Sequence, residues 1–108
     1  MTKEYYSIKC KDGVDRQVWD VEEMLANELA LEQTNMCRYY YYEFARFCDI
    51  FEYVARAGRK NIHTKEEDIA KAKNNLKQIK DKEFWLFMID KLCKITEIGE
   101  EVKKLIDK

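Results

Sequence analysis

A long series of apolar side chains at helical spacing dominates the middle of this 108-residue sequence. Between residues 35 and 57 they recur every three or four positions, which is the period of one face of an α-helix. Gly58 follows and supplies the left-handed conformation that commonly ends helices. Because this helix is apolar on most sides, we expect it to lie at the centre of the fold. The stripe consists of Cys37, Tyr40, Tyr41, Phe44, Cys48, Phe51 and Ala55.

Helices are expected along most of the remaining chain. The sequence contains no proline and three glycines, so little interrupts long helices. Two capping-box patterns, Asp20 with Glu23 and Thr64 with Glu67, predict helix starts. A further helix is predicted to begin near Asp81. Each segment carries an apolar stripe that should face the central helix, and in the first segment this stripe is Val21, Leu25 and Leu29, with Met24 and Leu31 beside it.

The two chain ends are predicted to form shorter elements. Residues 5–10 are rich in strand formers and residues 11–13 read as a turn, which favours a short hairpin or an extended arm. Gly99 is expected to break or bend the chain before a last helix over residues 100–107. We therefore predict one all-α domain, residues 1–108, built as a compact four- or five-helix bundle around the long central helix.

Charge is distributed unevenly along the sequence. Residues 14–34 contain six acids against the single base Arg16, whereas residues 56–82 contain nine bases and four acids. A molecule with opposite charges at its two ends can bind an anion at one of them, or pair head to tail with a second copy. The formal net charge of −1 argues neither for nor against a nucleic-acid partner, and direct nucleic-acid binding is not favoured among the functions below.

The first candidate site is the cationic turn after the central helix, formed by Tyr53, Arg56, Arg59, Lys60 and Lys65. Arginine grips phosphate with a planar fork, and lysine adds a mobile point charge. The next helix offers free backbone N–H groups at its start. These features predict a site for a phosphate-bearing ligand. Plain neutralisation of the helix dipoles is the alternative, because cations suit a helix C-terminus and acids such as those at 66–68 suit an N-terminus.

The same segment contains a two-block pattern, Arg-Ala-Gly-x-Lys followed by Glu-Asp-Ile-x-Lys-Ala. The pattern resembles the signature of a family of short tailed-phage proteins of unknown function, some of which are named phage nucleotide kinases. The resemblance covers about a third of the chain and implies a phage-type origin more than any activity. Cys48, Asp49 and Glu52 stand where the family has a Gly-Asn pair and a lysine. The matching residues are Tyr53, Arg56, Ala57, Gly58, Lys60, Glu67, Asp68, Lys71 and Ala72.

The second candidate site is acidic. Glu28 and Glu32 are one turn apart on the first helix, and Asp49 and Glu52 are one turn apart on the central helix. Paired carboxylates on neighbouring helices can hold Mg²⁺ against a pyrophosphate. The pattern is similar to Glu-x-x-Glu followed by Glu-x-x-Asp in all-helical nucleoside triphosphate pyrophosphatases, although the first spacing is one residue longer and the second pair is reversed. Solvated helix faces with salt bridges are the alternative.

Four successive tyrosines, residues 39–42, form the third candidate site. Adjacent residues on a helix point to every side, so all four cannot be buried. We expect Tyr39 and Tyr42 to be exposed or at an interface, where tyrosine is enriched, or to stack on bases. Packing against the N-terminal arm or another helix is the alternative.

Several classes of chemistry lack support in the sequence. Ser7 is the only serine and His63 the only histidine, which leaves no nucleophile with its base. There is no glycine-rich phosphate loop, and no cofactor is implied. The four cysteines form no C-x-x-C pair, so free thiols in a reducing cytoplasm are expected. No apolar segment has the length of a membrane span, which predicts a cytoplasmic protein without a membrane partner, in the host cell if phage-encoded.

Three functions fit these features. The first is a phage-type accessory protein without catalysis that binds a nucleotide or a signalling nucleotide. The second is an anti-defence or host-takeover inhibitor, similar in kind to anti-CRISPR proteins, that acts by binding a host protein. The third is a Mg²⁺-dependent nucleotide pyrophosphohydrolase. Self-association of the chain through the aromatic helix is compatible with all three.

Overall fold

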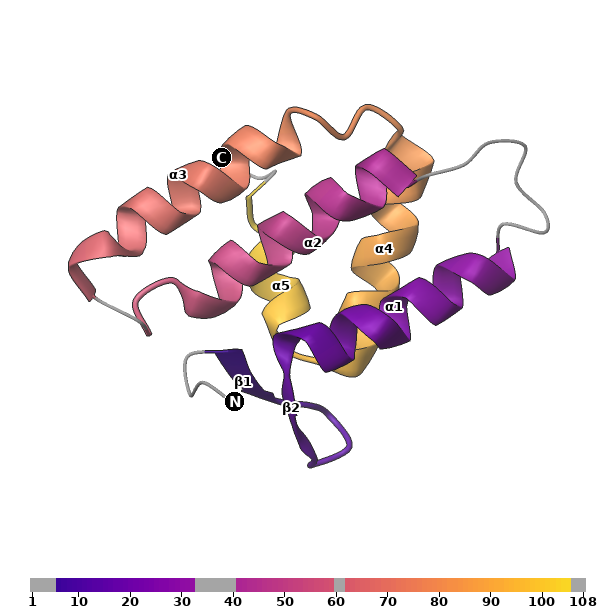
Figure 1. The fold of residues 1–108 in the computed structure, drawn as a ribbon, viewed down its shortest axis with the longest axis horizontal. Helices are drawn as coiled ribbons and strands as arrows, with labels where there is room; N and C mark the ends of the chain where they lie inside the picture. The colour runs from indigo at the N-terminus through magenta and orange to yellow at the C-terminus, as the bar shows by residue number, and fades with distance from the viewer. Residues whose placement is uncertain (1–5, 33–40, 60–61, 106–108) are drawn as a thin grey trace.

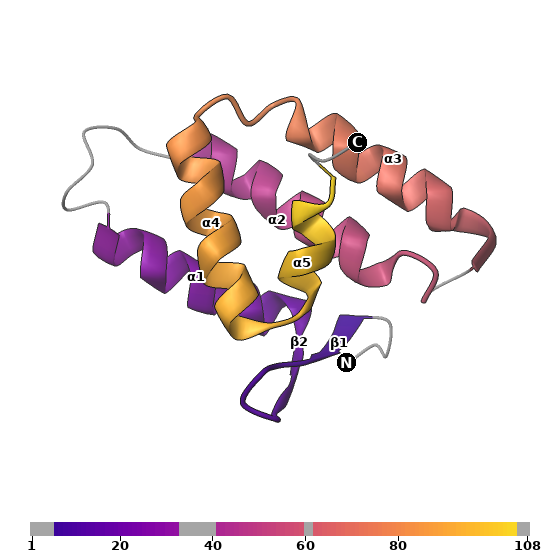
Figure 2. The same cartoon turned by 180° about the vertical axis from the view of Figure 1, so that it is seen from behind.

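Five α-helices and one hairpin make up the described part of the chain, residues 6–32, 41–59 and 62–105 of a computed structural model. In Figure 1, α2 crosses the middle of the molecule between α3 and α1, and Figure 2 shows α4 and α5 covering its other face. The predicted helical bundle with an N-terminal hairpin is therefore confirmed. The elements are β1 (Ser7–Lys9), β2 (Asp15–Gln17), α1 (Val18–Glu32), α2 (Tyr41–Arg56), the 3₁₀ turn η3 (Ile62–Thr64), α3 (Lys65–Leu76), α4 (Lys82–Ile95) and α5 (Ile98–Lys103).

The core is built from the apolar stripes of the helices. Phe47 of α2 packs edge-on against Trp85 of α4, with ring centroids 5.6 Å apart. Leu31, predicted to lie beside the apolar stripe of α1, is 72% exposed. It comes two residues after the buried Leu29 and therefore lies on the other side of the helix. The largest fully buried side chains are Phe47, Phe51, Phe84, Leu25, Ile50, Met88 and Leu92.

The hairpin joins directly to α1. Gly13 has a φ of 87°, which places the tight turn between β1 and β2 in the left-handed region that glycine favours. The helix begins at Val18, two residues before the predicted start. Asp20 is therefore not its N-cap but lies in the first turn, where its side chain accepts the backbone N–H of Gln17 at 3.2 Å. In a capping box, an acidic side chain in the first turn accepts the backbone N–H of the N-cap residue, and Asp20 makes this bond to Gln17.

The other predicted helix starts have different outcomes. Asp81 caps α4, because its backbone is extended and its side chain accepts the N–H of Phe84 at 3.0 Å. Thr64 is the N-cap residue of α3 but makes no side-chain cap bond, so the box predicted with Glu67 is wrong. The reason is its backbone, with φ −104° and ψ 7°, because an N-cap side chain reaches the helix amides from extended geometry.

The two glycines near helix ends differ in role. Gly58 follows α2 with a φ of 77°, as predicted. Gly99 was expected to break the chain, but it lies inside α5. A Cβ at Gly99 would meet the backbone nitrogen of Cys93 at 2.7 Å, so this glycine allows α5 to approach the end of α4 closely.

Some predictions fall outside the described residues. Among them are the proposed helical segment 35–40 with Tyr39, and Lys60 of the cationic turn. The thiols of Cys10, Cys48 and Cys93 are free, as expected. None of the helices in the described ranges combines the length and apolar character that crossing a bilayer requires.

Candidate functional site

Arg56, the central residue of the predicted cationic turn, is held inside the fold. Its guanidinium contacts Oδ1 of Asp68 through Nη2 at 3.1 Å and Nε at 3.2 Å. Nη1 also donates to the hydroxyl of Tyr6 at 3.2 Å, and the guanidinium lies 4.7 Å from the ring centroid of Tyr53. The side chains of Arg56 and Asp68 are only 19% and 5% exposed. Arg56 therefore ties α2 to α3 and to the N-terminal segment.

The aromatic ring of Tyr53 is engaged in the same way. Besides Arg56, the ammonium of Lys71 lies 5.8 Å from its centroid. Cations near an aromatic face are attracted to the ring quadrupole, so both contacts stabilise the seam between α2 and α3. The structure thus brings Tyr53 and Arg56 together, as the sequence predicted, but on a face where Asp68 already provides the anion.

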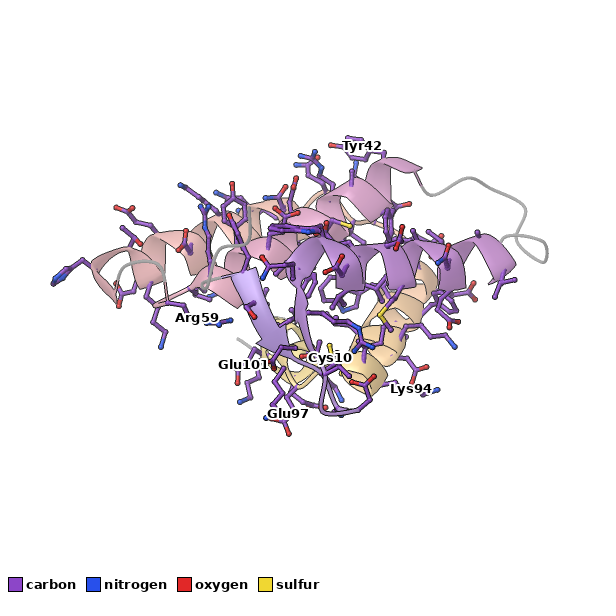
Figure 3. All side chains as sticks on the ribbon, turned by 60° about the horizontal axis from the view of Figure 1, so that its bottom comes forward. Cys10, Tyr42, Arg59, Lys94, Glu97 and Glu101 are labelled. Carbon is purple, nitrogen blue, oxygen red and sulfur yellow. The ribbon has the colours of Figure 1, made fainter. Side chains whose placement is uncertain are left out.

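Arg59 keeps its charge at the surface. Its guanidinium donates to the carbonyl oxygen of Ser7 on the hairpin and to that of Ala55 at 3.5 Å. In Figure 3, Arg59 and Glu101 lie on the same side of the molecule, and Tyr42 lies on the opposite edge. Arg59 is therefore near the turn predicted from the sequence but directed toward the hairpin.

Lys65 borders a hollow of about 310 Å³ between the end of α2, the start of α3 and α5. This volume is at the lower end of the range of small-molecule sites. Val54, Ala57 and Ile69 form an apolar floor, and Lys65 and Glu101 provide one charge of each sign. The sequence predicted Lys65 but not Glu101, because α5 meets α2 only through the tertiary fold.

Two further hollows lie elsewhere. One of about 460 Å³ follows the outer side of α3 and shares Lys65 and Ile69 with the first. The other, of about 500 Å³, lies beside the hairpin, where Figure 3 shows Cys10 and Glu97 close to each other. It is the larger hollow, but its lining residues, Lys9, Cys10, Lys11, Gly13 and Glu97, include none that the sequence predicted to bind a ligand. The hollow on the outer side of α3 is lined by that helix alone, whereas the hollow between α2, α3 and α5 has walls from three segments of the chain. We therefore consider the latter the better candidate.

Carboxyl groups gather at the seam between α1 and α2. Glu22 of α1 shares a hydrogen bond with Glu52 of α2 and lies near Asp49. Burial, together with these two neighbours, raises the pKa of Glu22 to about 9. At neutral pH Glu22 is therefore protonated and donates to the carboxylate of Glu52. Burial and the same carboxyl groups also raise the pKa of the Cys48 thiol.

The cluster differs from the magnesium site predicted from the sequence. Asp49 and Glu52 do belong to it, but the residue from α1 is Glu22 instead of Glu28. Glu28 approaches Lys91 of α4 at 3.8 Å, and the side chain of Glu32 is outside the described set. Within the described ranges, no three potential metal ligands are grouped so that they could hold an ion.

Tyr42 is exposed at the far end of α2, as predicted, with 59% of its surface accessible. Its hydroxyl donates to Oε1 of Gln78 at 3.1 Å. The guanidinium of Arg46 lies 5.3 Å from its ring centroid and also donates to Asn75 at 3.3 Å. The ring therefore has a fixed position beside the second half of α3.

No family model, curated protein or solved structure matches the chain. The resemblance to the tailed-phage family stays a prediction from the two sequence blocks. Any function has to be argued from the geometry of the described side chains.

Proposed function

We propose that the protein is a binding module without catalysis whose ligand is a nucleotide or a signalling nucleotide, seated in the hollow between α2, α3 and α5. One observation carries this proposal: Lys65 borders a small concave site with the apolar floor Val54, Ala57 and Ile69. Ligand sites in proteins are mostly apolar, with a few polar groups that fix orientation. A nucleotide needs both parts, because its base is apolar on its faces and its phosphate is anionic.

The charges at the rim suggest how such a ligand would be oriented. Lys65 attracts the phosphate as a point charge, and Arg59 adds positive charge at the same helix–helix turn. Glu101 repels phosphate and accepts hydrogen bonds, so it favours an exocyclic amino group of a base on its side of the hollow. Arg56 and Tyr53, by contrast, stabilise the fold next to the site.

The phage-type accessory role remains part of the proposal and rests on the resemblance of the Arg56–Lys60 and Glu67–Ala72 blocks. An inhibitor that binds a host protein is the second candidate. It is favoured by α1, which has no basic residue and exposes Trp19 to 45%. A Mg²⁺-dependent pyrophosphohydrolase gains no support, because such a site needs ionised carboxylates, whereas Glu22 holds a proton beside Glu52 and Asp49.

Thermal unfolding with added ligand tests the nucleotide proposal. A ligand that binds only the native state stabilises it by about 2.7 kcal/mol at a hundred times its Kd. We expect at least one of ATP, ADP and AMP to raise the Tm of the wild type, and this increase to be lost in Lys65→Ala. Lys94→Ala is the matched control, because Lys94 is exposed on α4 and pairs with Asp90. If no nucleotide raises the Tm, or if Lys65→Ala responds like the wild type, the proposal is wrong.

A further inference from the structure

The outer surface of α1 is acidic. The helix contains no lysine, arginine or histidine. Two large apolar side chains are also exposed on it, Trp19 at 45% near its start and Leu31 at 72% near its end. Aromatic and aliphatic anchors beside charged residues are typical of interaction surfaces. We call this surface the α1 patch, and it consists of Asp20 and Glu23 with Trp19 and Leu31.

The second half of α3 and the residues after it have the opposite character. Residues 69–80 contain four lysines and no acid, and all four lysines are exposed. Tyr42 is held beside this segment by its hydrogen bond to Gln78. We call this surface the α3 patch, and it consists of Lys73, Lys77, Lys80 and Tyr42.

The two patches lie on opposite flanks of α2. Figures 1 and 2 both show α2 between α3 and α1, so neither patch neutralises the other within one molecule. The helices are also similar in length, with 15 residues in α1 and 12 in α3. At 1.5 Å of rise per residue, each presents a surface roughly 20 Å long.

We propose that the α3 patch of one molecule docks on the α1 patch of a second copy. Lysines of α3 then face the acids of α1, and Tyr42 adds apolar contact where Trp19 or Leu31 of the other copy is exposed. Complementary charge specifies the partner and the orientation of such a contact. Because each copy uses two different patches, the contact either closes into a ring or continues into an open chain. Exposed ion pairs contribute little individually, so the association is weak and sensitive to salt.

Sedimentation velocity of the full chain tests this contact. We expect a weight-average mass above the 13.1 kDa of the monomer in about 50 mM NaCl, and a return to the monomer mass in about 500 mM NaCl. A monomer at both salt concentrations would overturn the proposal. So would an oligomer that does not respond to salt.

Charge reversal on each patch makes the test specific. The variant Glu23→Lys with Asn27→Lys makes the α1 patch basic, and Lys73→Glu with Lys77→Glu makes the α3 patch acidic. All four positions are exposed, so we expect unchanged helical circular dichroism. Each double variant alone should be monomeric at low salt, because like charges now meet.

Mixing the two variants supplies the complementary control. An equimolar mixture should associate again into a complex with equal amounts of both variants, because the α3 patch of each variant is opposite in charge to the α1 patch of the other. Association by either variant alone, or none in the mixture, would exclude a contact between copies. Capture of nucleic acid or of a foreign protein without self-association would do the same.

Discussion

Replacing Glu22 by glutamine tests the shared proton at the seam of α1 and α2. The pKa of Glu22 is 4.5 in its ordinary state and about 9 in the fold, where burial and the carboxyl groups of Glu52 and Asp49 oppose its ionisation. Between these two values the folded chain binds a proton that the unfolded chain has released. The free energy of unfolding therefore falls as the pH rises from about 4.5 to about 9.

The size of this decrease in the free energy of unfolding depends on how far the Glu22 side chain is exposed to water. Each pKa unit corresponds to about 1.4 kcal/mol. Glu22 is only partly buried, so water screens much of the effect, and we take about 2 kcal/mol as the loss between pH 5 and pH 9. Glutamine has no proton to lose, and its amide can still donate to Glu52. Glu22→Gln should therefore match the wild type near pH 5 and exceed its stability by about 2 kcal/mol near pH 9.

Urea unfolding followed by circular dichroism at several pH values between 5 and 9 measures this difference. At alkaline pH the same change corresponds to an increase in Tm of about 8 °C for a domain of this size. Glu23→Gln is the matched control, because Glu23 is the exposed neighbour on the same helix. Its profile should follow that of the wild type. If the wild type is equally stable at pH 5 and pH 9, or if Glu22→Gln runs parallel to it, Glu22 does not carry the proton.

Two further substitutions test the packing around the candidate site. Arg56→Ala should destabilise the fold by about 3 kcal/mol in urea unfolding, because it leaves Asp68 charged and buried. Adding Asp68→Ala should recover part of this lost stability. Arg59 is exposed, so Arg59→Ala should cost under about 1 kcal/mol. Equal losses of stability for Arg56→Ala and Arg59→Ala would contradict the geometry. Gly99→Ala should cost about 2 kcal/mol by overpacking. Cys93→Ala should not rescue it fully, because it removes the contact with Sγ at 2.8 Å but leaves those with the backbone nitrogen and Cα of Cys93 at 2.7 and 2.8 Å.

Features that depend on a few neighbouring residues could be predicted from the sequence. The left-handed Gly58 and the start of a helix near Asp81 are of this kind, and both form as predicted. The capping box predicted from Thr64 and Glu67 does not form. Asp81 has an extended backbone, whereas Thr64 ends the 3₁₀ turn η3, and the sequence pattern does not encode that difference in backbone.

The candidate site depends on contacts that are distant in the sequence, and these could not be predicted. Arg56, Arg59 and Lys65 look equivalent in the chain, as three cations around one helix end. The fold separates them, because α3 brings Asp68 to Arg56, the hairpin brings the Ser7 carbonyl to Arg59, and α5 brings Glu101 to the hollow beside Lys65. Which cation stays available to a ligand is therefore a property of tertiary packing.

Buried carboxylates do leave one signal in the sequence. Asp68 is four residues before the buried Ala72, and Glu43 is four residues before the buried Phe47. Each acid therefore lies on the same face of its helix as a buried apolar residue. A charge on the buried face of a helix needs a partner. Asp68 has Arg56, and Glu43 accepts the backbone N–H groups of Lys80 and Asp81 at 3.1 and 3.0 Å. An acid on the buried face of a helix therefore predicts that a cation or the start of another helix will contact it. For Asp68 that cation is Arg56, so Arg56 is not available to bind a phosphate.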